Sequence, residues 1–295
     1  MRKKSIYFIS RIFYCFISYT LIMLIGLNMV KICSFSFYHL KYQTINRYDI
    51  FYERVVLILD KIEEFQQMIH KAKRIVFFGG AGVSTESGIP DFRSEDGLYR
   101  LKYPYSPEEM LSHHFFMEHP EEFYSFYKEK VLWLDAKPNV THIKLAQWEE
   151  EGKLSGIVTQ NIDGLHQLAG SKCVLELHGS IYRNYCMKCR AFYDVHAIKD
   201  SQGIPLCGCG GMIKPDVVLY EESLDEMVVK QSILQIQQAD LLIVGGTSLS
   251  VYPAASFIQY FCGEHLVMIN RSKTSLDEKA DLILQKNLGT IFSQI

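Results

Sequence analysis

Short apolar runs alternate with segments of helical periodicity from residue 60 onward. The apolar runs cover residues 75–78, 156–159, 174–177, 241–244 and 266–269. Apolar residues recur at helical spacing in 61–72, which opens on the capping pattern Asp60 to Glu63, and in 224–238. Another helix is predicted to open at Ser106-Pro107-Glu108-Glu109. Short buried strands alternating with helices predict an α/β fold built on a doubly wound parallel sheet.

Two segments interrupt this alternation. Residues 97–138 are rich in aromatic residues at helical spacing, and residues 183–213 contain four clustered cysteines. We therefore expect a single domain, residues 59–295, in which these two insertions form a smaller helical and metal-binding lobe beside the sheet.

The first 58 residues differ from the rest. Residues 12–30 carry no charge and are about long enough to span a bilayer as a helix. A membrane anchor is one interpretation, although the positive-inside rule would then place the rest of the chain outside the cytoplasm. A signal peptide is a second, but no small-residue cleavage site follows. The third, which we favour, is an extension upstream of a natural start near Leu59 or Asp60. On this third interpretation the protein is cytoplasmic. Membrane association is expected only if residues 1–58 belong to the native protein.

The charge distribution bears on possible partners. Residues 1–58 carry eight Lys or Arg and two Asp or Glu, so the remaining chain is acidic, although the whole has a formal charge of -2. An acidic body lacks the basic stripe expected of a nucleic-acid-binding surface, and we expect no nucleic-acid partner. It is compatible with docking of basic, lysine-bearing peptides.

Four of the eight cysteines form two close pairs, Cys186 with Cys189 and Cys207 with Cys209, separated by seventeen residues. This spacing is close to that of a tetrahedral zinc site, although the second pair has one intervening residue and not two. Unpaired buried thiols are the alternative. We expect one structural zinc ion, since four cysteine ligands leave no open position for a catalytic water. A zinc-ribbon module that binds nucleic acid is a further alternative for the cysteines, but it would not explain the glycine-rich segment at residues 79–82.

A glycine-rich turn, Gly79-Gly80-Ala81-Gly82, follows the first apolar run. Glycines between a strand and a helix let backbone N–H groups close on a phosphate, so a phosphate-binding turn is predicted. The turn lacks the third glycine of the ordinary dinucleotide fingerprint. Its tail, Pro90-Asp91-Phe92-Arg93, adds a carboxylate, an aromatic ring and a guanidinium group.

Polar residues follow two later apolar runs, in Gln160-Asn161-Ile162-Asp163 and in His178-Gly179-Ser180. The carboxyl ends of parallel strands are where open α/β sheets bind ligands. Histidine titrates near neutral pH and can accept a proton from a hydroxyl group. A hydrogen-bonded loop histidine and simple turn caps at Asn161 and Asp163 are the alternatives.

Together these motifs resemble those of the sirtuins, the NAD-dependent protein lysine deacylases, over residues 60–295. The resemblance implies a Rossmann-like domain with NAD as co-substrate and acetyl-lysine proteins or peptides as substrates. The products would be nicotinamide, O-acetyl-ADP-ribose and free lysine. In sirtuins the acyl oxygen attacks the anomeric carbon of the nicotinamide ribose, and a histidine then deprotonates a ribose hydroxyl. On this resemblance His178 is the general base and Asn161 is the second catalytic residue.

The resemblance also assigns the remaining positions. Phe92 would cover the site, Ile162 and Asp163 would hold the carboxamide, and Asn270 would contact the adenosine ribose. The full cofactor set is Ala81, Thr85, Phe92, Arg93, Gln160, Ile162, Asp163, Thr247, Ser248, Asn270, Asn287 and Leu288. Val217 and Val218 would pair with the substrate backbone by strand addition. A glycine that sirtuins often carry in this segment is replaced here by Tyr220 or Glu221.

The sequence also bears on which acyl group is removed and on the type of reaction. Sirtuins that remove succinyl or malonyl groups use a Tyr-x-x-Arg pair, which this chain lacks, so a neutral acyl group is expected. A mono-ADP-ribosyltransferase would use the same pocket with another acceptor. A non-catalytic NAD- or ADP-ribose-binding module would need no base.

Overall fold

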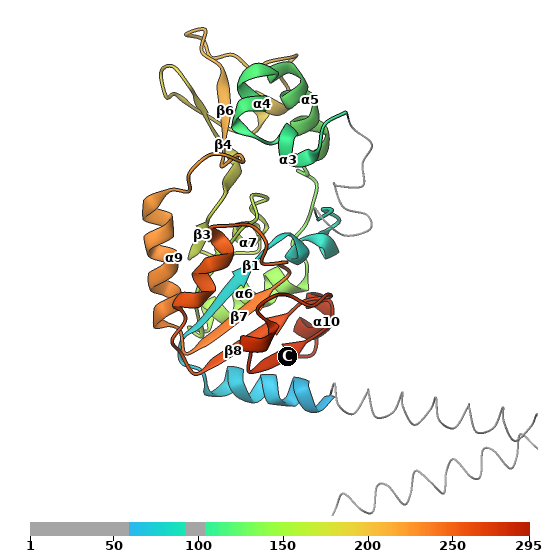
Figure 1. Cartoon of the computed structure of the whole chain (residues 1–295), viewed down its shortest axis with the longest axis vertical. Coiled ribbons are helices and arrows are strands. Elements are labelled where there is room, and N and C mark those ends of the chain that lie inside the picture. Colours follow the sequence, from blue (N-terminus) through green and yellow to red (C-terminus); the bar gives the residue numbers. More distant parts are fainter. Residues whose placement is uncertain (1–58, 92–103) are drawn as a thin grey trace, which may run out of the picture. The chain divides into compact units, whose positions relative to one another are not determined.

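The computed structural model describes residues 59–91 and 104–295 (Figure 1). Residues 58–295 form a compact unit by themselves. Within the described ranges no helix is both long and apolar enough to cross a membrane. The uncharged segment 12–30 lies outside them, as do the predicted cofactor residues Phe92 and Arg93.

Six parallel strands form the large sheet, in the order β3-β2-β1-β7-β8-β9. The strands are β1 (Ile75–Gly79), β2 (Leu154–Thr159), β3 (Val174–Glu176), β7 (Leu241–Gly245), β8 (His265–Ile269) and β9 (Leu282–Leu284). The order reverses between β1 and β7, as in dinucleotide-binding doubly wound sheets. The predicted fold class is therefore confirmed, and the short edge strand β9 is the one the apolar pattern did not predict.

Helices cover both faces of this sheet. On β1, Ile75 and Phe77 enter one core, and Val76 and Phe78 enter the other. Residues 59–71, α6 (Val140–Glu150) and α10 (Leu288–Phe292) pack on the first face. The second is covered by α9 (Glu226–Gln238) and the 3₁₀ segment Ala254–Tyr260. Strands buried on both faces read as continuous apolar runs, which is the pattern this sequence shows.

Two predicted helix starts were wrong by a few residues. Leu59 is already helical, so Asp60 lies inside the first helix and does not cap it. The helix predicted from residue 224 begins at Glu226, because Asp225 is its N-cap and accepts hydrogen bonds from the backbone N–H groups of Met227 and Val228. By contrast, Ser106 caps α3 as its motif predicts.

The smaller lobe contains an antiparallel sheet of β5 (Phe192–Tyr193), β4 (Gly179–Cys186) and β6 (Ile213–Val217). Against it pack α3 (Pro107–Met110), α4 (His113–Glu118) and α5 (Pro120–Lys130). Their shared core contains a cluster of six buried aromatic residues: Phe115, Phe116, Phe123, Tyr124, Phe126 and Tyr127. The small sheet extends beyond 183–213 at both ends. The described residues also form two single-turn α-helices, α7 (Leu165–Leu168) and α8 (His196–Lys199).

Candidate functional site

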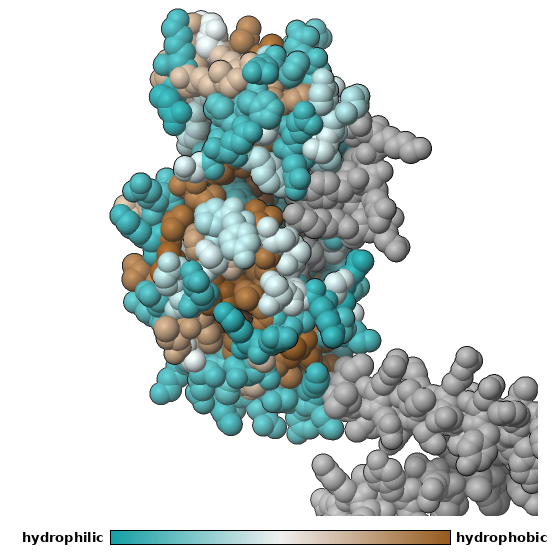
Figure 2. All heavy atoms as spheres, viewed as in Figure 1, coloured by the Kyte–Doolittle hydropathy of each residue, from teal (hydrophilic) through white to brown (hydrophobic). Residues whose placement is uncertain are grey.

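A cavity of about 760 Å³ lies at the carboxyl ends of the large sheet, where the strand order reverses. Loops after β1, β2, β7 and β8 line it, together with the segment that follows β6. On the face drawn in Figure 2, apolar residues gather in the middle and hydrophilic residues surround them. Every predicted catalytic, cofactor and peptide residue within the described ranges lines this cavity.

The glycine-rich turn packs against a second glycine turn after β7. The N–H of Gly82 donates to the carbonyl of Gly246 at 2.8 Å. A Cβ atom on Gly82 would lie 2.7 Å from the Cα of Gly246, and one on Gly80 would lie 2.8 Å from the Cβ of Thr247. Only glycine permits this approach. The two turns therefore form the base of the cavity together.

Within the described residues, no α-helix follows the glycine-rich turn directly. Two 3₁₀ turns, Ala81–Val83 and Thr85–Ser87, follow β1 and end at Gly88, whose φ is 87°. A glycine in the left-handed region ends a helical stretch, and Pro90 follows two residues later. Because no long helix begins here, backbone N–H groups and not a helix dipole are what this turn offers an anion.

Ser84 links the glycine-rich turn to the loop after β2. Its buried hydroxyl donates to Oδ2 of Asp163 at 2.6 Å and accepts from Nδ2 of Asn161 at 3.0 Å. Ser84 thereby orients Asn161 and Asp163, two of the three polar side chains that were predicted for this loop. Sequence reasoning did not single it out, although its place within the glycine-rich turn was the available signal.

Asp163 is a half-buried carboxylate whose orientation is determined by its hydrogen bonds. Burial raises its pKa, while hydrogen bonds from Ser84 and from the N–H of Leu165 act in the opposite direction. The neighbouring carbonyl of Ile162 accepts from the N–H of Ile181, which attaches this loop to β4. The loop therefore presents an oriented acceptor to the cavity.

His178 lies between β3 and β4. Its Nδ1 donates to the carbonyl of Gln160 at 2.9 Å, because a carbonyl can only accept. Burial lowers the pKa of His178, so the ring is neutral at pH 7 and Nε2 is left as the basic nitrogen. The backbone carbonyl of His178 accepts from the N–H of Val218 at 3.0 Å, which connects His178 to the predicted peptide-binding segment. The arrangement suits proton abstraction within the cavity.

A second polar chain crosses the cavity from β2 to β8. Gln160 Nε2 donates to Oγ1 of Thr247 at 3.0 Å, and the N–H of Thr247 donates to Oδ1 of Asn270 at 3.0 Å. Nδ2 of Asn270 is buried without a hydrogen-bond partner. A buried orphan donor costs free energy, so this amide suits a ligand oxygen. Arg271 and Lys273 line the same end of the cavity and favour an anionic ligand.

The remaining predicted cofactor residues serve different ends. Thr85 donates its hydroxyl to the carbonyl of Gly82, so it stiffens the turn. Ser248 bonds the hydroxyl of Ser250 at 2.6 Å. Leu288 is buried and packs beneath the end of β7, where a Cβ on Gly245 would lie 2.7 Å from it. Asn287 and Ala81 line the cavity.

The segment after β6 is held by the helical part of the lobe. The N–H of Tyr220 donates to the carbonyl of Leu111, and the N–H of His113 donates to the carbonyl of Tyr220, both at 3.0 Å. Glu221 has a φ of 76°, the region that glycine favours, and its carboxylate accepts from Nδ1 of His114 at 2.8 Å. The residue that stands in for glycine is therefore Glu221.

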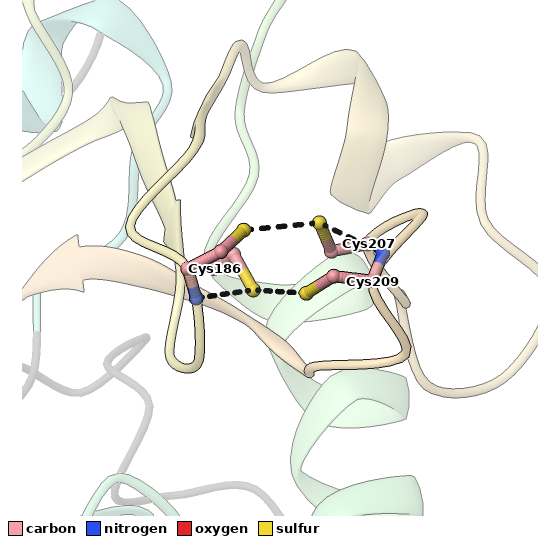
Figure 3. A group of neighbouring side chains, drawn as sticks. Cys186, Cys207 and Cys209 are labelled. Carbon is pink, nitrogen blue, oxygen red and sulfur yellow. Dashed lines mark hydrogen bonds between the residues drawn. The ribbon is translucent and has the colours of Figure 1, made fainter.

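The four predicted metal ligands converge. The sulfurs of Cys186, Cys189, Cys207 and Cys209 all lie within 4.8 Å of one another. Figure 3 shows sulfurs from the two cysteine turns facing each other. In a tetrahedral zinc site with bonds of ~2.3 Å the sulfurs would lie ~3.8 Å apart. The cluster therefore has the size and donor type of a four-thiolate zinc site.

Backbone N–H groups point at the sulfurs of Cys186 and Cys207 and favour their thiolate forms. Cys186 accepts from the N–H groups of Lys188 and Cys189, each at 3.4 Å. The N–H of Cys209 and the hydroxyl of Tyr193 lower the pKa of Cys207 to about 6. The one-residue spacing of the second pair fits a tight turn, in which the N–H of Cys207 donates to the carbonyl of Gly211.

Comparisons with known proteins place these features in context. Residues 80–253 match the Sir2 family. The chain is 57% identical over 244 residues to the NAD-dependent protein deacetylase of Clostridium acetobutylicum, covering 81% of this chain and 100% of that protein. The corresponding protein of Clostridium perfringens is 56% identical over 240 residues, covering 80% and 98%. A solved structure of Sir2 with a p53 peptide and NAD+ has a TM-score of 0.73 and 40% identity, covering 79% and 96%.

Proposed function

The chain belongs to the Sir2 family, and we propose that it removes acetyl groups from protein lysines with NAD as co-substrate. The products are nicotinamide, O-acetyl-ADP-ribose and the free lysine. The observation that carries the proposal is His178. A half-buried neutral histidine, whose Nδ1 is bonded to Gln160 so that Nε2 is left as the basic nitrogen, lines the same cavity whose base is built from the two glycine turns. Relatives with the name NAD-dependent protein deacetylase support the proposal.

The glycine turns and the β8 end of the cavity would bind the dinucleotide. Backbone N–H groups of the turns suit the phosphates. The orphan amide of Asn270 suits a hydroxyl of the adenosine ribose, and Asn287 and Leu288 would lie beside the adenine. The oriented carboxylate of Asp163 can accept hydrogen bonds from the carboxamide N–H groups of nicotinamide.

In the proposed reaction, His178 would be the general base and Asn161 would assist it, in the following steps. The acyl oxygen attacks the anomeric carbon, the glycosidic bond breaks, and nicotinamide leaves with the bonding electron pair. His178 Nε2 takes the proton of a ribose hydroxyl, whose oxygen attacks the imidate carbon. Water completes the release of the lysine amine and leaves the acetyl group on the ribose. Asn161, oriented by Ser84, would hold the ribose during these steps.

The peptide would enter beside the segment after β6. Val217 and Val218 line the cavity there, and an extended peptide could pair with this segment as an added strand. A solved structure described as Sir2 bound to acetylated peptide, 38% identical to this chain, supports the substrate class. The absence of a Tyr-x-x-Arg pair from the sequence supports a neutral acyl group.

The cysteine cluster would hold one zinc ion and would do no chemistry. Four sulfur donors fill a tetrahedral ion and leave no position for water. All six cysteines of the described part of the chain are free thiols. A reducing compartment keeps such thiols available for zinc, which supports a cytoplasmic location.

The test is a peptide assay with the full chain. An acetyl-lysine peptide should lose one acetyl group when NAD is present and none when NAD is omitted. Transfer of label from NAD onto protein, without deacetylation, would instead indicate an ADP-ribosyltransferase. Binding of NAD with neither reaction would indicate a non-catalytic module.

A further inference from the structure

The side chain that caps α6 bonds directly to the segment 83–87, which follows the glycine-rich turn. Asn139 is the N-cap of α6, and its Oδ1 accepts from the N–H of Thr141 at 3.0 Å. Its Nδ2 donates to the carbonyl of Val83 at 2.7 Å and to Oγ of Ser87 at 3.0 Å. The acceptor end of this amide therefore serves its own helix, and the donor end serves the turn.

The orientation of the amide is determined by its neighbours. A flipped amide would set its oxygen against the carbonyl of Val83 and its NH₂ against the N–H of Thr141. The backbone N–H of Asn139 donates to Nδ1 of His142 at 3.3 Å. Burial lowers the pKa of His142 to about 4, so that ring is neutral at pH 7 and can accept. His142 thus takes the place that Glu or Gln usually fills in a capping box.

The bonds from Asn139 enclose the part of the turn that reaches the reaction site. Ser84 and Thr85 lie between Val83 and Ser87, and Ser84 orients Asn161 and Asp163. The same turn is tied to β7 through Gly82 and to α10 through Glu86, whose carboxylate accepts from the N–H of Gly289 at 2.7 Å. A shift of residues 83–87 would therefore move Ser84 away from both of its partners.

We propose that Asn139 is a positioning residue for NAD, holding residues 83–87 in the geometry that the dinucleotide meets on binding. The inference rests on the proposed function, since it takes the turn to be part of the NAD site. Asn139 touches no reacting atom. Its effect is pre-organisation: a turn that is already ordered pays no ordering entropy when the ligand arrives, so affinity increases.

The experiment separates the capping role from the positioning role. Asn139→Ser keeps an oxygen that can cap α6 but removes both donors to the turn, whereas Asn139→Ala removes cap and donors. Asp225→Ala is the matched control, because Asp225 caps α9 and its side chain bonds only that helix. NAD affinity is measured by calorimetry, KM and kcat by nicotinamide release, and stability by thermal melting.

Both Asn139 variants should bind NAD about tenfold more weakly and show a similar rise in the KM for NAD, with kcat at saturating NAD changed much less. Asn139→Ala and Asp225→Ala each lose a helix cap and should lower the melting temperature by a few degrees, Asn139→Ser keeps a capping oxygen and should lower it less than Asn139→Ala, and Asp225→Ala should bind NAD as the wild type does. Wild-type affinity and KM in Asn139→Ser would overturn the positioning role and leave the proposed function standing. Failure of the wild-type chain to bind NAD would overturn the proposed function, and the positioning role with it.

Discussion

The large sheet with its helices and the smaller lobe are stabilised by different means. The large sheet has six strands with apolar helices on both faces, and its core is continuous from residues 59–71 to α10. The small lobe has three short strands, an aromatic cluster and four converging thiols. The comparison teaches that the loops that would bind the dinucleotide are carried by a sheet whose stability does not depend on the cysteine cluster. The segment that would bind the peptide follows β6, in the smaller lobe, which contains that cluster.

Breaking the metal site should separate the two cores most clearly. Cys186→Ala removes one of the four sulfurs, and structural zinc sites contribute folding free energy outright. We expect loss of zinc and unfolding of the small lobe, with the large sheet retained. Hydrogen exchange should show lost protection in α5 and preserved protection in β1. Cys262→Ala, an exposed cysteine outside the cluster, is the control. Wild-type protein that is fully folded and free of zinc would contradict the assignment.

Replacing His178 tests the chemistry of the cavity and leaves the large sheet and the smaller lobe unchanged. His178→Ala should lower the deacetylation rate by about 10²-fold or more. The fold should be unchanged, and exchange of labelled nicotinamide into NAD should persist, because nicotinamide leaves before the base acts. Deacetylation and nicotinamide exchange are measured on the same preparation. Normal turnover of the variant would show that another group removes the proton.

Acid should weaken the large core through two buried histidines. Burial lowers the pKa of His142 to about 4 and that of His166 well below its usual value, and their rings lie 4.7 Å apart. The unfolded chain therefore binds more protons between pH 4 and 6.5, so stability is full above pH 6.5 and is lost as the pH falls. His142 alone accounts for about 3 kcal/mol of this loss. Denaturant unfolding at a series of pH values measures it.

A control for the acid effect comes from His166→Phe, which removes one titrating ring from a site that already contacts Phe77. The acid-induced loss of stability should then be smaller. An unchanged profile would assign the effect to groups outside this pair.

The smallest expected effect compares two tyrosines in the aromatic core of the lobe. The hydroxyl of Tyr124 donates to the carbonyl of Ile213 at 2.6 Å, whereas the buried hydroxyl of Tyr127 has no hydrogen-bond partner. Tyr124→Phe should lower the free energy of unfolding by about 1 kcal/mol. Tyr127→Phe should be neutral or stabilising, since it removes an unsatisfied polar group. Denaturant unfolding of both variants checks the difference, and equal effects would contradict it.

The sequence predicted the large sheet because its strands are buried on both faces and therefore appear as unbroken apolar runs. The sequence also indicated that His178, Asn161 and Asp163 lie near one another, since each comes within a few residues of the end of a parallel strand. The place of Asn139 could not be predicted in this way. It is separated from Val83 by 56 positions, and only the packing of α6 beside the turn brings them together. Contacts of this kind depend on tertiary packing and leave no local signal.

The local structure after the glycine-rich turn differs from that of an ordinary strand-to-helix turn. Gly88 takes the left-handed conformation and Pro90 follows, so the chain forms two 3₁₀ turns where such turns continue into a helix. Gly88 and Pro90 are the local signal for this break in the sequence.

The most direct test of the account is the product balance of one reaction. Full-length protein is incubated with NAD and an acetyl-lysine peptide, and nicotinamide, deacetylated peptide and acetylated ADP-ribose are quantified together. The account predicts that the three form in equal amounts and that none forms without NAD. Deacetylated peptide accompanied by free acetate, with no release of nicotinamide, would contradict it.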